Sequence, residues 1–162
     1  MNPCQEAKQG LTLGGQDCSD SERARYYGRV SKPLLDRIDI LVEVPAVTFR
    51  DIISRTEGEG SASIRARVEA ARKRQVERLR ADGGRRRIYT NSQMGPRQVK
   101  KYCPVEAESL KLLEMAVTKL GLSARAFDRV LKVARTVADL AGEEAIRALH
   151  LAEAIQYRKI DR

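Results

Sequence analysis

Apolar residues at helical spacing dominate this chain from residue 61 onward, and they constrain its fold more than any other feature. The stretch 123–142, SARAFDRVLKVARTVADLAG, has a broad apolar face with the periodicity of an α-helix. Ser123 is a good N-cap for that helix, and Gly142 is a good terminating residue. Three further stretches are also predicted to be helical: residues 96–103, 104–121 and 146–160. We therefore predict a mainly α protein with an antiparallel helical bundle over residues 96–162.

A single stretch has the pattern of a β-strand. Residues 38–44 form a nearly continuous β-branched apolar run that Pro45 closes, which is typical of a strand buried on both faces of a parallel sheet. Such a strand needs neighbours, and no second stretch of this kind is present. We predict a lone strand at 38–44, and we expect residues 1–60 to be poorly ordered or to pack abnormally because the strand edges have no partners.

Positive charge is concentrated in the middle of the chain. The net charge is +9, and residues 61–87 contain 10 basic and 3 acidic side chains. Their thin apolar stripe predicts a long, mostly solvated helix, and the Gly-rich residues 81–96 predict a linker after it. This basic block is either a nucleic-acid footprint or simply a solvated helix face. The candidate DNA-binding residues are Arg72, Lys73, Arg74, Arg78, Arg80, Arg85, Arg86 and Arg87.

The cysteines and the hydropathy pattern suggest where the protein works. The chain has three cysteines, no apolar signal-like start and no apolar run approaching the ~20 residues of a membrane span, so we expect a cytoplasmic protein without a membrane partner. Cys4 and Cys18 supply two thiolates, which do not close a tetrahedral zinc site, so no metal is expected. Cys103 is predicted to be a small buried apolar residue at a helix end, and His150 to be a surface or packing residue.

Five collinear blocks carry a resemblance to a known family. They are NPC at 2–4, SKPLLDRIDILVEVP at 31–45, IRARVEAARKRQVERL at 64–79, LSARAFDRVLKVARTVADLAG at 122–142 and HLAEAIQYRKIDR at 150–162. Together they resemble the C-terminal portion, from sensor 1 to the lid, of the ComM/YifB-like proteins, the magnesium-chelatase-related branch of the AAA+ ATPases. The resemblance implies that most of the parent's sheet lies upstream, which would explain the lone strand.

The resemblance also implies roles for individual residues. Arg37, in LLDRID, matches the arginine finger that reaches into the neighbouring subunit's ATP site. Asn2 matches sensor 1, and Arg125 matches the sensor 2 arginine of the lid. Arg129, one turn later, is the alternative lid residue for the nucleotide. From the residues alone, Asn2 could instead be a turn former, Arg37 could pair with a neighbouring aspartate, and both lid arginines could be ordinary solvated residues.

One physical argument for Arg125 is independent of the family. Arg125 is predicted to lie in the first turn of its helix, where the helix dipole disfavours a cation by about 0.3–1 kcal/mol. An anion such as an ATP phosphate would relieve this mismatch.

Three regions follow from these patterns. Residues 1–60 are the expected remnant of an AAA+ core, residues 61–95 the basic helix and linker, and residues 96–162 the helical lid. The sequence contains no G-x-x-x-x-G-K-[ST] loop and no acidic strand end for Mg²⁺, so the chain alone should not hydrolyse ATP.

The implied parent is an ATP- and Mg²⁺-dependent DNA motor, linked to branch migration in natural transformation. Its expected partners are the remainder of the AAA+ core, neighbouring subunits of a hexameric ring, and DNA, whereas the chain alone should be monomeric and bind no cofactor. One alternative is a stand-alone basic helical module that binds DNA or protein. A third possibility is a magnesium chelatase subunit, although nothing in the sequence specifies a porphyrin.

Overall fold

The computed structural model describes residues 31–42, 44, 58–81 and 87–158, together with isolated positions at 21, 25, 28, 29 and 53. Contacts divide the chain into two compact units. Residues 39–41 and 59–159 form the larger unit, called the helical unit below, and residues 1–38, 42–58 and 160–162 form the smaller one. The elements in chain order are α2 (Lys32–Leu35), α4 (Ser61–Arg80), η2 (Asn91–Gln93), α5 (Pro96–Tyr102), α6 (Ala107–Leu120), α7 (Ala124–Ala141) and α8 (Ala148–Gln156).

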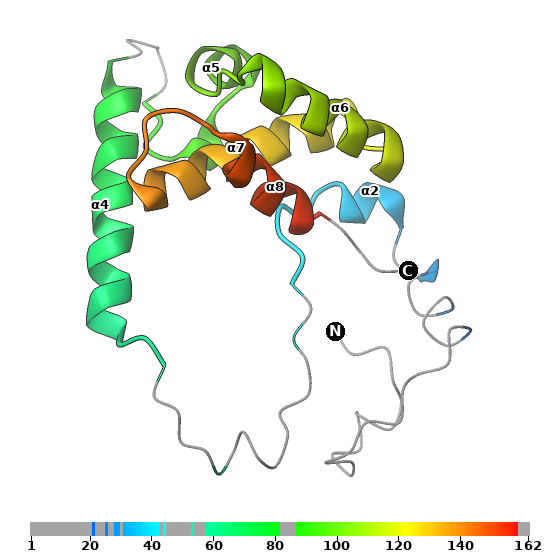
Figure 1. Ribbon diagram of the computed structural model, residues 1–162, viewed down its shortest axis with the longest axis horizontal. Helices are drawn as coiled ribbons and strands as arrows, with labels where there is room; N and C mark the ends of the chain where they lie inside the picture. The colour runs from blue at the N-terminus through cyan, green and yellow to red at the C-terminus, as the bar shows by residue number, and fades with distance from the viewer. Residues whose placement is uncertain are drawn as a thin grey trace. The chain divides into compact units, whose positions relative to one another are not determined.

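Helix α7 lies at the centre of the helical unit. It packs against α8, α4, η2 and α5, while α6 packs against α8 (Figure 1). The apolar face predicted for residues 123–142 is the face that α7 buries. Val130, Ala134 and Ala138 on this face have no exposed surface. Leu113 of α6 and Leu151 of α8 join the same core. The prediction of a mainly α protein with a helical bundle is confirmed.

The ends of α6 and α7 lie where the sequence places them. Gly121 follows α6 with φ 58° and Gly142 follows α7 with φ 81°, both in the left-handed region that favours glycine. The side chain of Ser123 caps α7 by accepting a hydrogen bond from the Ala126 N–H at 3.2 Å. A short parallel bridge between Val105 and Ile146 also joins the segments that precede α6 and α8.

Helix α4 is buried over only half of its length. Ala71, Gln75 and Leu79 form its buried side, whereas residues 61–70 are all exposed. In Figure 1, the C-terminal end of α7 meets α4 and the N-terminal part of α4 extends away from the other helices. The predicted long, mostly solvated helix is therefore present, and it is anchored at its C-terminal half.

Part of the segment predicted as a linker is packed against the helical unit. Asn91 and Met94 are almost completely buried, and η2 packs against α7. The sequence lacks helical periodicity here because a single 3₁₀ turn is too short to produce it. Residues 82–86 lie outside the described residues, and the predicted boundary between residues 95 and 96 stays a prediction.

The lone strand predicted at 38–44 is wrong for the positions that the structure describes. Residues 38–42 and 44 carry no strand, and Ile40, Val42 and Val44 are exposed. A strand is stable only when neighbours accept and donate its backbone hydrogen bonds. The Leu41 N–H instead donates to the Tyr157 carbonyl at 2.8 Å. In the smaller unit, α2 ends in a turn in which the Arg37 N–H donates to the Leu34 carbonyl at 2.9 Å.

Across the described residues, every helix is too short or too polar to cross a membrane.

Candidate nucleotide site and nucleic-acid surface

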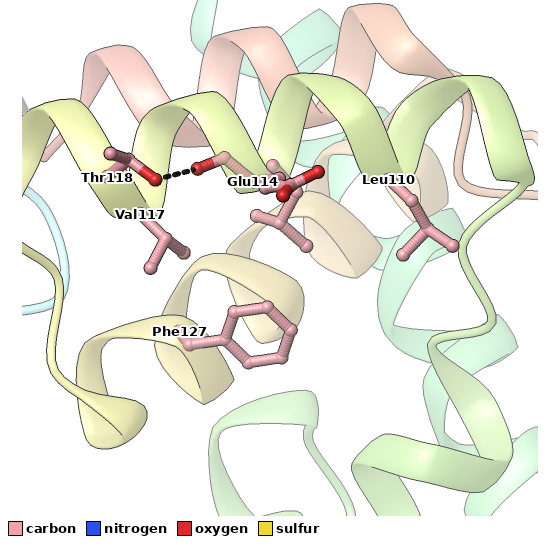
Figure 2. A pocket seen from close by; sticks show the side chains of 6 residues that line it. Leu110, Glu114, Val117, Thr118 and Phe127 are labelled. Atoms are coloured by element: carbon pink, nitrogen blue, oxygen red, sulfur yellow. Dashed lines mark hydrogen bonds between the residues drawn. The ribbon is translucent and has the colours of Figure 1, made fainter.

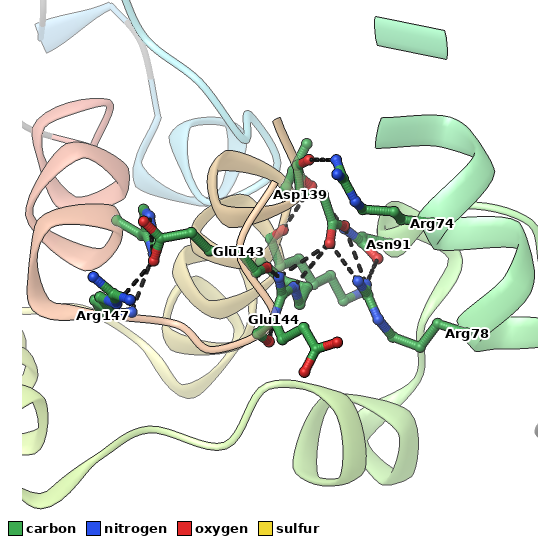
Figure 3. Close-up of polar contacts among 11 residues, drawn as sticks. Arg74, Arg78, Asn91, Asp139, Glu143, Glu144 and Arg147 are labelled. Atoms are coloured by element: carbon green, nitrogen blue, oxygen red, sulfur yellow. Dashed lines mark hydrogen bonds and ion pairs between the residues drawn. The ribbon is translucent and has the colours of Figure 1, made fainter. Parts of the chain in front are cut away.

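Asp139 is the centre of a buried polar cluster where α4, η2 and α7 meet (Figure 3). Its side chain is fully buried and accepts hydrogen bonds from Arg135 at 3.1 Å and from the Asn91 amide at 2.8 Å. Arg78 of α4 donates to the same carboxylate through its two terminal guanidinium nitrogens, Nη1 and Nη2. Arg74, one turn earlier on α4, donates to the backbone carbonyl of Asp139 at 3.0 Å. These four residues with Asp139 are called the Asp139 cluster below.

The Asp139 cluster ties the C-terminal half of α4 to α7 within the helical unit. Arg135 is buried and also donates to the carbonyls of Glu143 and Glu144, just after α7. Burial lowers the pKa of the Arg135 guanidinium, and the charge of Asp139 opposes that shift. Sequence analysis did not identify this cluster. The available signal was an arginine and an aspartate four residues apart on the apolar face of one helix.

The Asp139 cluster divides the candidate DNA-binding residues into two groups. Arg74 and Arg78 both bind Asp139; Arg74 is nevertheless exposed, whereas the Arg78 side chain is only 20% exposed. Arg72, Lys73, Arg80 and Arg87 are exposed. Arg85 and Arg86 lie outside the described residues. The exposed cations of α4 could therefore follow a phosphate backbone while Arg74 and Arg78 hold the helix in place.

Residues 39–41, just after LLDRI, contact the rest of the helical unit at two points. The carboxylate of Asp39 forms an ion pair with Arg129 of α7. Two residues later, the Leu41 N–H binds the carbonyl of Tyr157 at the end of α8. The Arg129 side chain is 24% exposed and that of Asp39 is 52% exposed.

The predicted nucleotide residues lie on different elements. Arg125 is exposed in the first turn of α7, directly after the Ser123 cap, as the sequence predicts. Arg37 is exposed in the turn after α2, in the smaller unit. Asn2 lies outside the described residues. The nucleotide and DNA roles of all these residues stay predictions.

The described cysteine and histidine are both packing residues. Cys103 is buried at the end of α5, as predicted, and burial raises the pKa of its thiol to about 11. His150 is fully buried, and its Nδ1 accepts a hydrogen bond from the Arg147 N–H at 3.1 Å. Within the described ranges, no cluster of three or more His, Cys, Asp or Glu residues could hold a metal ion. Cys4 and Cys18 lie outside those ranges.

An open, mostly apolar groove of about 350 Å³ lies between α6 and α7 (Figure 2). It is lined by Leu110, Leu113, Glu114, Val117, Thr118 and Phe127. The Thr118 hydroxyl donates to the Glu114 carbonyl at 3.0 Å, so this hydroxyl is already used within its own helix.

Comparison with known protein families shows which family this chain belongs to. Residues 58–158 match the family described as "Magnesium chelatase, subunit ChlI C-terminal", and residues 1–52 match "Magnesium chelatase, subunit ChlI". The chain belongs to the magnesium chelatase ChlI family. The first match covers most of the helical unit, including α4 and the Asp139 cluster.

Individual relatives of this ChlI-family chain agree. It is 40% identical over 147 residues to YifB of Escherichia coli, and the aligned region covers 90% of this chain and 27% of YifB. It is 40% identical over 145 residues to the competence protein ComM of Haemophilus influenzae, covering 89% of this chain and 27% of ComM. The resemblance to the C-terminal part of the ComM/YifB-like proteins is confirmed. The chain spans about a quarter of the length of these relatives.

Proposed function

We propose that this chain supplies the lid and the arginine-finger segment of an AAA+ ATPase that assembles as a cytoplasmic ring, expected to be a hexamer, and moves DNA by branch migration. Membership of the ChlI family supports the ATPase part of the proposal. The similarity to a protein named for competence supports the DNA part. The remaining core would come from sequence outside the chain, since this chain matches only 27% of the length of relatives of this kind.

The observation that carries the nucleotide role is the position of Arg125. It is an exposed cation in the first turn of α7, where the helix dipole disfavours a positive charge. A phosphate group bound there would compensate the positive charge of Arg125 and the positive end of the helix dipole. Arg125 is therefore suited to contact a phosphate of ATP, whereas ligands for Mg²⁺ would come from the rest of the core. When bound, ATP supplies the phosphoryl group whose transfer to water drives the motor.

Arg37 is proposed to act on the nucleotide of the neighbouring subunit. A guanidinium placed against the transferring phosphoryl group neutralises the charge that develops there, an effect of about 10³–10⁵ in turnover in other nucleotide hydrolases. Arg37 is exposed and lies next to the segment 39–41 in sequence. Its side chain is long and permanently charged, as this role requires.

Turnover of ATP by the intact protein tests this assignment. Arg37→Ala should lower kcat by about 10³-fold or more while ATP still binds. Arg97→Ala, which removes an exposed arginine of α5, is the matched control and should leave turnover unchanged. Undiminished turnover and branch migration by Arg37→Ala would remove the finger assignment.

The proposed DNA surface is the exposed basic face of α4. Arg72, Lys73 and Arg80 are exposed there, and the Asp139 cluster holds the helix that carries them. Contacts of this kind are electrostatic, so binding should be indifferent to sequence and should weaken steeply with salt. The same face could serve a basic helical module without an ATPase parent, and the turnover experiment separates these two functions.

Fluorescence anisotropy of labelled DNA against salt concentration tests this surface in the chain itself. The double variant Arg72→Gln, Lys73→Gln should reduce the slope of log affinity against log salt by about 2, one for each lost phosphate contact. Arg147→Gln removes an exposed cation that pairs with Glu143 and should leave the slope unchanged. Affinity that is the same at low and high salt would contradict a phosphate-binding face.

A further inference from the structure

We propose that Arg129 is a positioning residue that clamps the segment 39–41 to the lid, so that the finger segment moves with α7 and α8. This inference rests on the proposed function, because it concerns the delivery of Arg37. Arg129 is one of two lid arginines that sequence analysis offers as the nucleotide residue. The structure gives its guanidinium a carboxylate partner, Asp39.

Two independent contacts make the clamp. Arg129 lies near the start of α7 and binds the Asp39 side chain, whereas the carbonyl of Tyr157 lies at the end of α8 and binds the backbone N–H of Leu41 at 2.8 Å. The first contact fixes a side chain and the second fixes the backbone two residues later. Because α7 and α8 pack closely on one another, both anchors belong to one rigid part of the helical unit.

Covalent geometry extends the effect of the clamp to Arg37. Two residues of extended chain span at most about 7 Å, so the Arg37 Cα stays within that distance of the Asp39 Cα. A lid movement that displaces Asp39 by much more than this distance must therefore carry the backbone of Arg37 with it. Exposed ion pairs are weak, so this one is suited to form and break during a cycle rather than to stabilise the fold.

The clamp separates the roles of the two lid arginines. A guanidinium paired with the Asp39 carboxylate is partly neutralised, whereas Arg125 is exposed one turn earlier on the same helix. Arg125 is therefore the lid residue that contacts phosphate, and Arg129 acts through the segment that it holds.

Hydrogen–deuterium exchange at the Leu41 amide tests the clamp in this chain, without ATP. Arg129→Gln and Asp39→Asn should each accelerate exchange of this amide by about tenfold or more, because the backbone contact loses its neighbouring anchor. Both variants should change Tm by less than about 3 °C, since the pair is partly exposed. Arg147→Gln, which breaks an exposed pair elsewhere in the unit, is the control and should leave the Leu41 amide unchanged.

Kinetics of the intact protein provide the second readout. Arg129→Gln should lower kcat about tenfold with KM for ATP unchanged, and the swapped pair Arg129→Asp with Asp39→Arg should regain part of that loss. Arg125→Gln should instead raise KM for ATP. If Arg129→Gln raises KM for ATP and leaves Leu41 exchange unchanged, Arg129 is a nucleotide ligand and the clamp is overturned. If the intact protein hydrolyses no ATP, the proposed function fails, and the exchange result alone still decides whether the clamp exists.

Discussion

Asp139 joins α4 to α7 through a buried charge. Its fully buried carboxylate is shared by Arg135 of the same helix and Arg78 of α4, with Asn91 as a third donor. Buried ion pairs contribute little net stability when complete, but removing one partner leaves an uncompensated charge in the interior. Loss of any one charged partner from the Asp139 cluster should therefore be strongly destabilising.

Replacing this carboxylate should be costly. Asp139→Asn should lower the free energy of unfolding by about 3–5 kcal/mol, because Arg135 would stay buried without a counter-charge. Urea denaturation followed by circular dichroism measures the change. Glu59→Gln disrupts an exposed pair with Arg67 and serves as the control, with no measurable change expected. A destabilisation as small as that of the control would show that Asp139 does not hold the junction.

Cys103 predicts a dependence of stability on pH. Burial raises the pKa of its thiol from the usual 9.0 to about 11, so the folded state holds this proton more tightly than the unfolded state. The resulting stability is fully present below pH 9 and is lost as the pH rises from about 9 to about 11. In that window, the free energy of unfolding should fall by about 1.4 kcal/mol per pH unit more steeply than in Cys103→Ala. Parallel urea titrations at pH 8, 9 and 10 measure this difference, and equal slopes for the two proteins would contradict it.

At the scale of elements, α4 has one apolar stripe with two different environments. Leu79, at its C-terminal end, is buried in the core, whereas Ile64 and Val68 are 41% exposed. Periodicity identified the stripe from sequence, because residues at helical spacing share a face whatever covers them. It could not show where the cover ends, since that depends on the tertiary contacts of α7 and η2.

The two ends of α4 should therefore respond differently to truncation of an apolar side chain. Leu79→Ala should cost about 2–5 kcal/mol, because it leaves a cavity in the core. Ile64→Ala should change the free energy of unfolding by less than about 0.5 kcal/mol in this chain, since the side chain is partly solvated and alanine favours helix. Chemical denaturation of the two variants side by side gives the comparison. A loss of similar size at both positions would mean that the N-terminal half of α4 is covered.

Other elements show why sequence analysis succeeds at some positions and fails at others. The limits of α6 and α7 were predictable because Gly121, Ser123 and Gly142 act locally, through φ and a capping hydrogen bond. The strand predicted at 38–44 was wrong at the described positions because a strand depends on partners that its own residues do not encode. The pairs Arg129–Asp39 and Arg78–Asp139 join residues 90 and 61 positions apart, which no local pattern reveals.

For the whole molecule, family membership and local geometry support different parts of the proposed function. The ChlI-family match and the relatives YifB and ComM place the chain in a larger protein family, and the structure adds the lid-bound segment and the anchored basic helix. The proposed motor also requires a contact between neighbouring subunits. Each ATP site must be completed by Arg37 of a neighbouring subunit.

Mixing two inactive forms of the intact protein tests that contact most directly. One form carries Arg37→Ala, and the other carries a substitution of the phosphate-binding lysine that the proposed ATPase core would supply. In a ring assembled from equal amounts of both, roughly a quarter of the interfaces would pair an intact ATP site with an intact Arg37. We expect the mixture to recover about that fraction of wild-type ATP turnover, with each form alone inactive. A mixture as inactive as its components, or an Arg37→Ala form that turns over at the wild-type rate, would contradict the role of Arg37 across subunits.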